Sequence, residues 1–274
     1  MAQFSCIIVA GGSGSRMQAD RKKAFIELAD EPLVLHTARA FKSVSGIAEM
    51  VVVLPADELK QLTASDSANV DTSKLPQEAE RLAFQLQEAG VTHLVVGGAR
   101  RQDSVLNGLW ATSPDSDYVM VHDAARPFVT SDELQSLMQR TVETGAAILA
   151  HPVRDTLKAV AVDKGIEKTV SRNGLWAAQT PQAFGRQALL DAFKHHNSAN
   201  VTDDAEMFAL AGGRCSVVQG SAQNFKITTP EDLQMAEALI VMRSVRDGDI
   251  RPASAIFRRI PGGDTIFDVE PPKS

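Results

Sequence analysis

The chain contains 274 residues, of which 44% are hydrophobic and 23% charged, the balance of a soluble globular protein with a sizeable buried core. A formal net charge of -6 argues against a general nucleic-acid binder, because such a protein needs clustered positive charge. Two cysteines, Cys6 and Cys215, are too few for a disulfide framework or a Cys-rich zinc site.

The start of the chain lacks the charged residues and the long apolar stretch of a signal peptide. Elsewhere the apolar runs are a handful of residues long, far short of the ~20 that are needed to cross a bilayer. These features predict a cytoplasmic protein that does not enter a membrane.

Short apolar runs alternate with helical patterns along most of the chain. This alternation predicts an α/β fold with a doubly wound, mostly parallel sheet and helices on both of its faces. Ligands of such sheets bind at the carboxyl ends of the strands. The predicted strands are residues 4–10, 50–54, 94–96, 118–121 and 146–153, and helical patterns cover 32–41 and a segment that begins at Ser131.

Three stretches depart from this pattern. Residues 57–76 are rich in Ser, Thr and Asp, which predicts a polar surface insertion. Residues 154–175 alternate around the turn Asp163-Lys164-Gly165, which predicts a protruding β-hairpin, a shape often used to grip a second subunit. Residues 246–274 are rich in Pro and Gly and are interpreted as a loosely ordered tail. We therefore expect a single domain over 1–245, with 154–175 as its arm.

A glycine-rich turn follows the first predicted strand. The segment Ala10-Gly11-Gly12-Ser13-Gly14-Ser15-Arg16-Met17 places backbone N–H groups where they can surround phosphate oxygens, and Arg16 and Lys23 add positive charge. It is not a Walker A loop, because no Gly-Lys-Ser/Thr follows. Nor is it a dinucleotide fingerprint, because Met17 stands where the third glycine would be.

A second motif, Val121 to Pro127, ends the fourth predicted strand. Asp123 stands where a doubly wound sheet places its ligands, so we expect its carboxylate to hold Mg²⁺. His122 is interpreted as a half-buried, hydrogen-bonded histidine rather than as a catalyst. Arg126 is either an interior ion-pair partner or a subunit contact.

Two later segments carry helix starts. Thr229 is expected to cap a helix whose first residue is Pro230. Lys226 is expected in a short strand just before this cap, an unusual place for a purely solvated lysine. The segment Thr202 to Glu206 is expected to open another helix with an acidic first turn.

The order of these segments resembles the 2-C-methyl-D-erythritol 4-phosphate cytidylyltransferase family of the non-mevalonate isoprenoid pathway. The resemblance runs from about Ser5 to about Met242. It implies a Rossmann-like nucleotidyltransferase fold and a homodimer formed through the arm. It rests on the turn that ends in Arg16-Met17, on Gln102–Val105, His122–Pro127, Pro152–Thr156, Arg172–Trp176, Gln179–Gln182, Thr202-Asp203 and Asn224–Thr228.

In the activity that the resemblance implies, the phosphate of methylerythritol phosphate attacks the α-phosphorus of CTP and pyrophosphate leaves, with Mg²⁺ as cofactor. Asp123 is then the metal ligand, and the arm residues Thr156 and Arg172 serve the partner's site. Four residues are expected to stabilise the reacting phosphates or to position the acceptor: Arg16, Lys23, Arg172 and Lys226. Others are expected to line the substrates: Ala10, Gly11, Gly12, Ser13, Gly14, Ser15, Gly98, Ser104, Ala124, Thr156 and Thr180.

Two positions depart from the pattern of the family. Lys22-Lys23-Ala24 stands where the family has Pro-Lys-Gln, so either lysine fits the catalytic role, and we expect Lys23. Ala99 stands where an acidic residue often follows the double glycine, which leaves one nucleoside contact open.

The closest alternative is a pentitol phosphate cytidylyltransferase, such as a ribitol 5-phosphate enzyme, which would share the glycine turn and the nucleotide site. The residues Ala124-Ala125, 155–158 and 172–176 favour methylerythritol phosphate. The segment around Ser104 disfavours a sugar-phosphate nucleotidyltransferase that uses UTP or GTP.

A non-catalytic nucleotide-binding module is a different class of function on the same fold. Such a module would be indicated by the loss of Arg16, Lys23 or Asp123. All three residues are present, so the sequence favours an enzyme.

Overall fold

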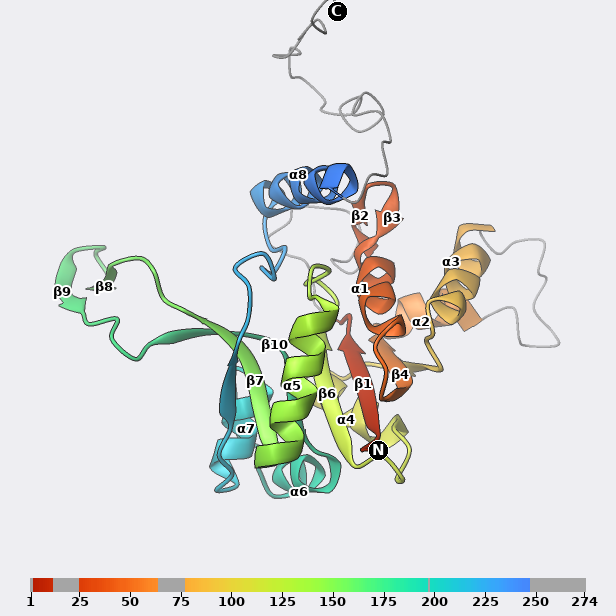
Figure 1. Ribbon diagram of the computed structural model, residues 1–274, viewed down its shortest axis with the longest axis horizontal. Coiled ribbons are helices and arrows are strands. Elements are labelled where there is room, and N and C mark those ends of the chain that lie inside the picture. The colour runs from red at the N-terminus through yellow and green to blue at the C-terminus, as the bar shows by residue number, and fades with distance from the viewer. Residues whose placement is uncertain (1, 12–24, 64–76, 197, 247–274) are drawn as a thin grey trace, which may run out of the picture.

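The computed structural model describes residues 2–11, 25–63, 77–196 and 198–246 (Figure 1). Residues 64–76 of the predicted insertion and residues 247–274 of the predicted tail lie outside this part. The strands are β1 (Phe4–Val9), β2 (Glu27–Leu28), β3 (Glu31–Pro32), β4 (Ile47–Leu54), β5 (His93–Val96), β6 (Tyr118–Asp123), β7 (Ala146–Pro152), β8 (Leu157–Val160), β9 (Ile166–Val170), β10 (Trp176–Gly185) and β11 (Ser216–Gln219). The helices are α1 (Leu33–Lys42), α2 (Ala56–Thr63), α3 (Gln77–Glu88), α4 (Arg101–Ala111), α5 (Ser131–Thr144), α6 (Arg186–His196), α7 (Asp204–Leu210) and α8 (Pro230–Arg246).

Seven of the described strands form one sheet in the order β11-β7-β10-β6-β1-β4-β5. The pairs within β6-β1-β4-β5 are parallel, and so is β11 with β7. Strand β10 runs antiparallel to both β6 and β7. The predicted mostly parallel α/β sheet is therefore confirmed, and β10 is a strand that the sequence patterns did not reveal.

Strand β1 shows why the sheet is covered on both faces. Phe4, Cys6 and Ile8 pack in one apolar cluster with α1 and α5, whereas Ile7 packs in a second cluster with α4 and α6. Successive side chains of a strand point to opposite faces, so both faces of β1 are buried. A strand buried on both faces is apolar throughout, which explains the continuous apolar run in the sequence.

Capping interactions set the predicted helix starts. The Oγ1 of Thr130 accepts the Glu133 N–H at 3.3 Å, and the Glu133 carboxylate accepts the Thr130 N–H at 2.8 Å. Thr229 and Asp232 form the same reciprocal pair at the start of α8. Each pair satisfies backbone donors that a helix leaves unpaired at its first turn. The starts expected at Ser131 and Pro230 are confirmed.

The predicted hairpin is present as β8 and β9, which pair with each other and not with the main sheet. It stands away from the body of the molecule (Figure 1). The Ala161 N–H donates to the Gly165 carbonyl at 2.9 Å and closes the turn. Val160, Val162 and Ile166 on this arm are more than half exposed, at 53%, 105% and 67%.

The prediction of a polar insertion is wrong for its first residues. Residues 56–63 form α2, and Leu62 is only 6% exposed because it packs in the apolar cluster beside α1. The polar composition of the segment hid the two leucines, Leu59 and Leu62, that bind this helix to the body of the protein.

The prediction of a strand at Lys226 is also wrong. Residues 224–228 form an irregular loop, and the Ile227 N–H donates at 2.9 Å to the carbonyl of Ala125 rather than to a strand. Ile227 is fully buried in a small cluster with Phe128 and Leu239 of α8. This packing holds the loop against the residues that follow β6.

Among the described helices, none is both long and apolar enough to span a lipid bilayer.

Candidate active site

The carboxyl ends of β1 and β6 lie side by side, because Val9 and Asp123 are partners in this parallel pair. Gly11 follows β1, and Gly97-Gly98 follow β5 at the same edge of the sheet. The described motifs therefore meet at the strand ends, where parallel sheets bind their ligands.

Asp123 is the centre of a charged cluster at this edge. Its Oδ2 lies 2.8 Å from Lys226 Nζ and 3.6 Å from Arg126 Nε, and its Oδ1 lies 3.4 Å from Arg101 Nε. The side chain of Lys226 is 39% exposed, compared with 30% for Arg101 and 13% for Arg126. Lys226 is thus the cation of this cluster that solvent or a ligand meets most easily.

Arg101 joins Asp123 to a second carboxylate. Its Nη1 and Nη2 lie 3.2 and 2.9 Å from the two carboxylate oxygens of Asp204, while its Nε faces Asp123. Asp204 is the first residue of α7, and its side chain is only 2% exposed. One guanidinium therefore ties α7 to the end of β6 with a two-pronged contact that only arginine provides.

The charges of the cluster shift the pKa values of its acids. Burial alone would raise the pKa of Asp123, but Arg101, Lys226 and Arg126 outweigh it and hold this pKa well below its ordinary value. Burial outweighs Arg101 at Asp204 and raises the pKa of that carboxyl. Asp123 thus provides fixed negative charge at neutral pH.

Burial lowers the pKa of His122 to about 4, so the imidazole is neutral at physiological pH. His122 is fully buried rather than half-buried as expected, because the turn after β6 and the ring of Phe41 cover it. Its Nε2 lies 3.0 Å from the Arg126 carbonyl oxygen and its Nδ1 lies 3.1 Å from Thr180 Oγ1. Both nitrogens are therefore engaged within the protein.

Gly98, Ser104 and Gly11, which were expected to line the substrates, lie close to one another. The Gly98 N–H donates to Ser104 Oγ at 3.0 Å, and this hydroxyl donates to the Arg100 carbonyl at 3.2 Å. A Cβ on Gly98 would lie 2.3 Å from Asp103 Cβ, so only glycine fits there. A Cβ on Gly11 would lie 3.6 Å from Ser104 Oγ. The Ser104 hydroxyl thus holds this loop in shape.

Ala10, Ala124 and Thr180 are buried beside the cluster, at 2%, 1% and 5% exposure. The Ala124 N–H donates to the Val9 carbonyl at 3.1 Å, and Thr180 Oγ1 accepts the Asp123 N–H at 3.0 Å. These predicted site residues use their polar groups to hold the strand ends.

Thr156 and Arg172 are exposed at the base of the arm. Within the part of the chain that the structure describes, no hydrogen bond or ion pair joins either residue to the Asp123 cluster. The predicted residues Gly12, Ser13, Gly14, Ser15, Arg16, Lys22 and Lys23 lie outside the described residues.

Sequence reasoning missed Arg101 and Asp204. Arg101 is the first residue of α4, where a cation faces the positive end of the helix dipole. This unfavourable position could have indicated that carboxylates elsewhere in the fold stabilise the Arg101 charge. Asp204 was interpreted as an ordinary acid of a first turn, although Asp203 already caps α7 by accepting the Glu206 N–H at 2.9 Å.

The donor set near Asp123 fits a divalent cation that arrives with its substrate. Among the described residues, no three His, Cys, Asp or Glu side chains gather as a ready-made metal site. Among the described residues, the Oδ1 of Asp123 contacts only Arg101 Nε, at 3.4 Å, which leaves lone pairs that could bind a metal. Hard cations of this kind commonly take one or two carboxylates, with water and substrate phosphates as the other ligands.

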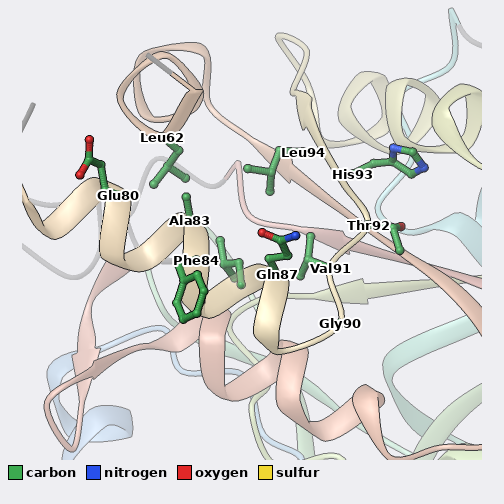
Figure 2. Close-up of a pocket in the computed structure, with 11 residues that line it drawn as sticks. Leu62, Glu80, Ala83, Phe84, Gln87, Gly90, Val91, Thr92, His93 and Leu94 are labelled. Carbon is green, nitrogen blue, oxygen red and sulfur yellow. The ribbon is translucent and has the colours of Figure 1, made fainter. Parts of the chain in front are cut away.

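A separate groove of about 810 Å³ lies between α3 and the start of β5, away from the strand ends (Figure 2). Leu62, Ala83, Phe84 and Leu94 line it. Glu80, Gln87, Thr92 and His93 also line it, so its surface is mixed, and it includes no member of the Asp123 cluster.

A mostly parallel α/β sheet with glycines, carboxylates and cations at its strand ends suits a protein that binds phosphorylated ligands, the class to which nucleotidyltransferases belong. The family model of 2-C-methyl-D-erythritol 4-phosphate cytidylyltransferase, IspD, matches residues 4–242. The chain belongs to this family and is therefore an enzyme of the cytidylyltransferase class. The family expected from the sequence motifs is confirmed.

Individual relatives agree with this assignment. The 2-C-methyl-D-erythritol 4-phosphate cytidylyltransferase of Halalkalibacterium halodurans is 39% identical over 246 residues, which cover 89% of this chain and 100% of the relative. The enzyme of the same name from Pelotomaculum thermopropionicum is 38% identical, and the match covers 90% of this chain and 98% of that relative. The crystal structure of the Thermus thermophilus enzyme of the same name has a TM-score of 0.66 at 30% identity, covering 86% of this chain and 98% of that one.

Arg101→Met should destabilise the fold, because it leaves the buried Asp204 carboxyl without its counter-charge. We expect the free energy of unfolding, measured by urea titration, to fall by about 3–5 kcal/mol. The double variant Arg101→Met/Asp204→Leu should recover most of this loss, because it removes the buried charge as well.

Arg140→Met is the matched control. Arg140 pairs with Glu143 at 3.1 Å on an exposed face of α5, so its loss should leave the unfolding free energy almost unchanged. An Arg101→Met variant as stable as this control would show that the Arg101 bridge does not hold α7 in place.

Proposed function

We propose that the Asp123 cluster transfers the cytidylyl group of CTP to 2-C-methyl-D-erythritol 4-phosphate and releases pyrophosphate. The observation that carries this proposal is the convergence of Lys226, Arg126 and Arg101 on Asp123 at the end of β6. Two anionic substrates can approach each other only where cations neutralise them and hold them in line.

The reaction needs no general base from the protein. A phosphate monoester is already largely a dianion near neutral pH, because its second pKa is ~6. One of its oxygens attacks the α-phosphorus of CTP, and the bond from that phosphorus to the bridging oxygen of the β-phosphate breaks. His122 fits this scheme, because both of its nitrogens are bonded within the protein.

The triphosphate is held by the turn that begins at Gly11, with Gly12–Ser15 around the phosphates. Arg16 and Lys23 stabilise the charge that develops at the α-phosphate. Asp123 would hold Mg²⁺, which would supply positive charge to neutralise the reacting phosphates. The cytosine and ribose lie near Gly98 and Ser104, beside Ala10 and Gly11.

The acceptor lies over the exposed end of Lys226, close to Arg126 and Asp123. Its remaining contacts come from Thr156 and Arg172 on the arm of a partner subunit in a homodimer. Two features support this arrangement. Among the described residues, no hydrogen bond or ion pair joins Thr156 or Arg172 to the cluster of the same chain. Val160, Val162 and Ile166 of the arm expose apolar area that a second subunit would cover.

We place the enzyme in the cytoplasm. Cys6 and Cys215 are free thiols, which suit a reducing compartment. The sheet and its charged edge hold two small anionic substrates and need no membrane or nucleic acid.

With Mg²⁺ and CTP, we expect pyrophosphate release with methylerythritol phosphate and none above background with ribitol 5-phosphate. A coupled pyrophosphate assay measures both, and chelation of the metal should abolish release. Turnover with ribitol 5-phosphate alone would keep the site and its mechanism but assign a different acceptor. Silence with both would contradict the proposed reaction.

Arg16→Ala and Lys23→Ala should each lower kcat on the order of 100- to 1000-fold, since each removes a cation from the developing charge. Lys22→Ala is the matched control and should stay within a few-fold of the unaltered enzyme. Thermal unfolding should be similar for all three variants. The opposite result for the two lysines would move the catalytic role to Lys22.

Mixing two inactive variants tests whether the arm serves the partner. Arg172→Ala removes the acceptor contact of the arm, and Asp123→Asn removes the metal-binding carboxylate. If the arm acts across the dimer, a mixed dimer contains one intact site, so an equimolar exchanged mixture should recover about a quarter of full activity. If the arm serves its own chain, the mixture will stay inactive.

A further inference from the structure

His122 lies next to Asp123 but on the other face of β6. Successive residues of a strand alternate between faces, so Asp123 turns toward α4 and α7 while His122 turns toward α1. The rings of His122 and Phe41 meet edge-on, with centroids 5.0 Å apart. The histidine therefore lies under the turn formed by residues 123–126, on the face of the sheet opposite the Asp123 carboxylate.

Counting donors and acceptors fixes the direction of its hydrogen bonds. The Arg126 carbonyl can only accept, so Nε2 of His122 carries the proton in the 3.0 Å contact. The Asp123 N–H donates to Thr180 Oγ1, which leaves the proton of that hydroxyl free to donate to Nδ1 at 3.1 Å. One continuous chain of hydrogen bonds thus begins at the Asp123 backbone and ends at the Arg126 backbone.

We propose that His122 is a positioning residue, whose imidazole holds both ends of the Asp123–Arg126 turn at the spacing that the transfer reaction requires. This inference rests on the proposed function of the cluster. The turn is closed directly by the Arg126 N–H, which donates to the Asp123 carbonyl at 3.0 Å. The imidazole adds a second, indirect link between the two ends of the turn, through Thr180 to Asp123 and through its own bond to the Arg126 carbonyl.

The same turn carries the loop of Lys226. Arg126 Nη1 donates to the Asn224 carbonyl at 2.8 Å, and Asn224 Nδ2 donates to the Thr180 carbonyl at 2.9 Å. Asn224 is fully buried, so these bonds are shielded from water. A change in the turn therefore moves Asp123, Arg126 and Lys226 together, and misplacement by ~1 Å can cost about 100-fold in rate.

Three substitutions separate hydrogen bonding from packing. His122→Asn retains an acceptor near the position of Nδ1, and His122→Gln retains a donor near the position of Nε2. His122→Leu fills the space and keeps neither bond. The exposed His195 of α6 supplies the control His195→Gln, which should behave as the unaltered enzyme.

For His122→Leu we expect kcat/KM for the acceptor to fall about 100-fold, with intermediate losses for the Asn and Gln variants. KM for CTP should change much less than kcat/KM for the acceptor, because the proposed glycine turn supplies contacts to the triphosphate that do not depend on His122. A folded Leu variant within threefold of the unaltered enzyme would overturn the proposal. So would equal losses in all three, since shape alone would then explain them.

A tautomer measurement keeps the test independent of folding and of turnover. In ¹⁵N spectra of the imidazoles, with the His122 signals identified by their absence in His122→Gln, we expect the Nε2–H form at neutral pH. A predominant Nδ1–H or doubly protonated ring would overturn the hydrogen-bond chain. Failure of the unaltered enzyme to turn over methylerythritol phosphate would instead refute the proposed function, whatever the tautomer.

Discussion

The negative charge of Asp123 is the constraint on which the site depends. Arg101, Arg126 and Lys226 come from a helix start, a turn and a loop, and they would repel one another without a shared counter-charge. Asp123 lies within 4 Å of a nitrogen of each, and Asp204 supplies the second negative charge through Arg101. The attraction therefore gathers three cations at one place on the edge of the sheet.

The sheet explains how a charged Asp123 can be the chain neighbour of a neutral His122. Because strand side chains alternate, the last two residues of β6 send a carboxylate to one face and an uncharged imidazole to the other. The carboxylate side organises α4 and α7, and the imidazole side organises the turn and Thr180. Strand β10 contributes Thr180 and is the antiparallel strand beside β6, so its pairing brings this hydroxyl to the Asp123 backbone.

Elements with strong local signals were predictable. The strands 4–10 and 118–121, the cap at Thr229, the helix start within 202–206 and the hairpin around Asp163-Lys164-Gly165 are encoded by apolar runs, side-chain acceptors and turn residues within a few positions. Predictions failed where packing overrides composition. Helix α2, at the start of the polar segment, is anchored by Leu59 and Leu62. The loop at Lys226 is held by a hydrogen bond to a turn about a hundred residues earlier in the chain.

The sequence by itself determined the α/β class and the family, and it predicted a ligand site at the strand ends with Asp123 as a metal ligand. Those conclusions depend on residues that are neighbours in the chain or on an ordered set of motifs. Only the tertiary structure decided that Arg101 bridges Asp123 and Asp204, that His122 is fully buried with both nitrogens bonded, and that Thr180 supports the Asp123 backbone. These contacts join residues far apart in the chain, and no local pattern encodes which charges and hydroxyls the folded sheet brings within hydrogen-bond distance.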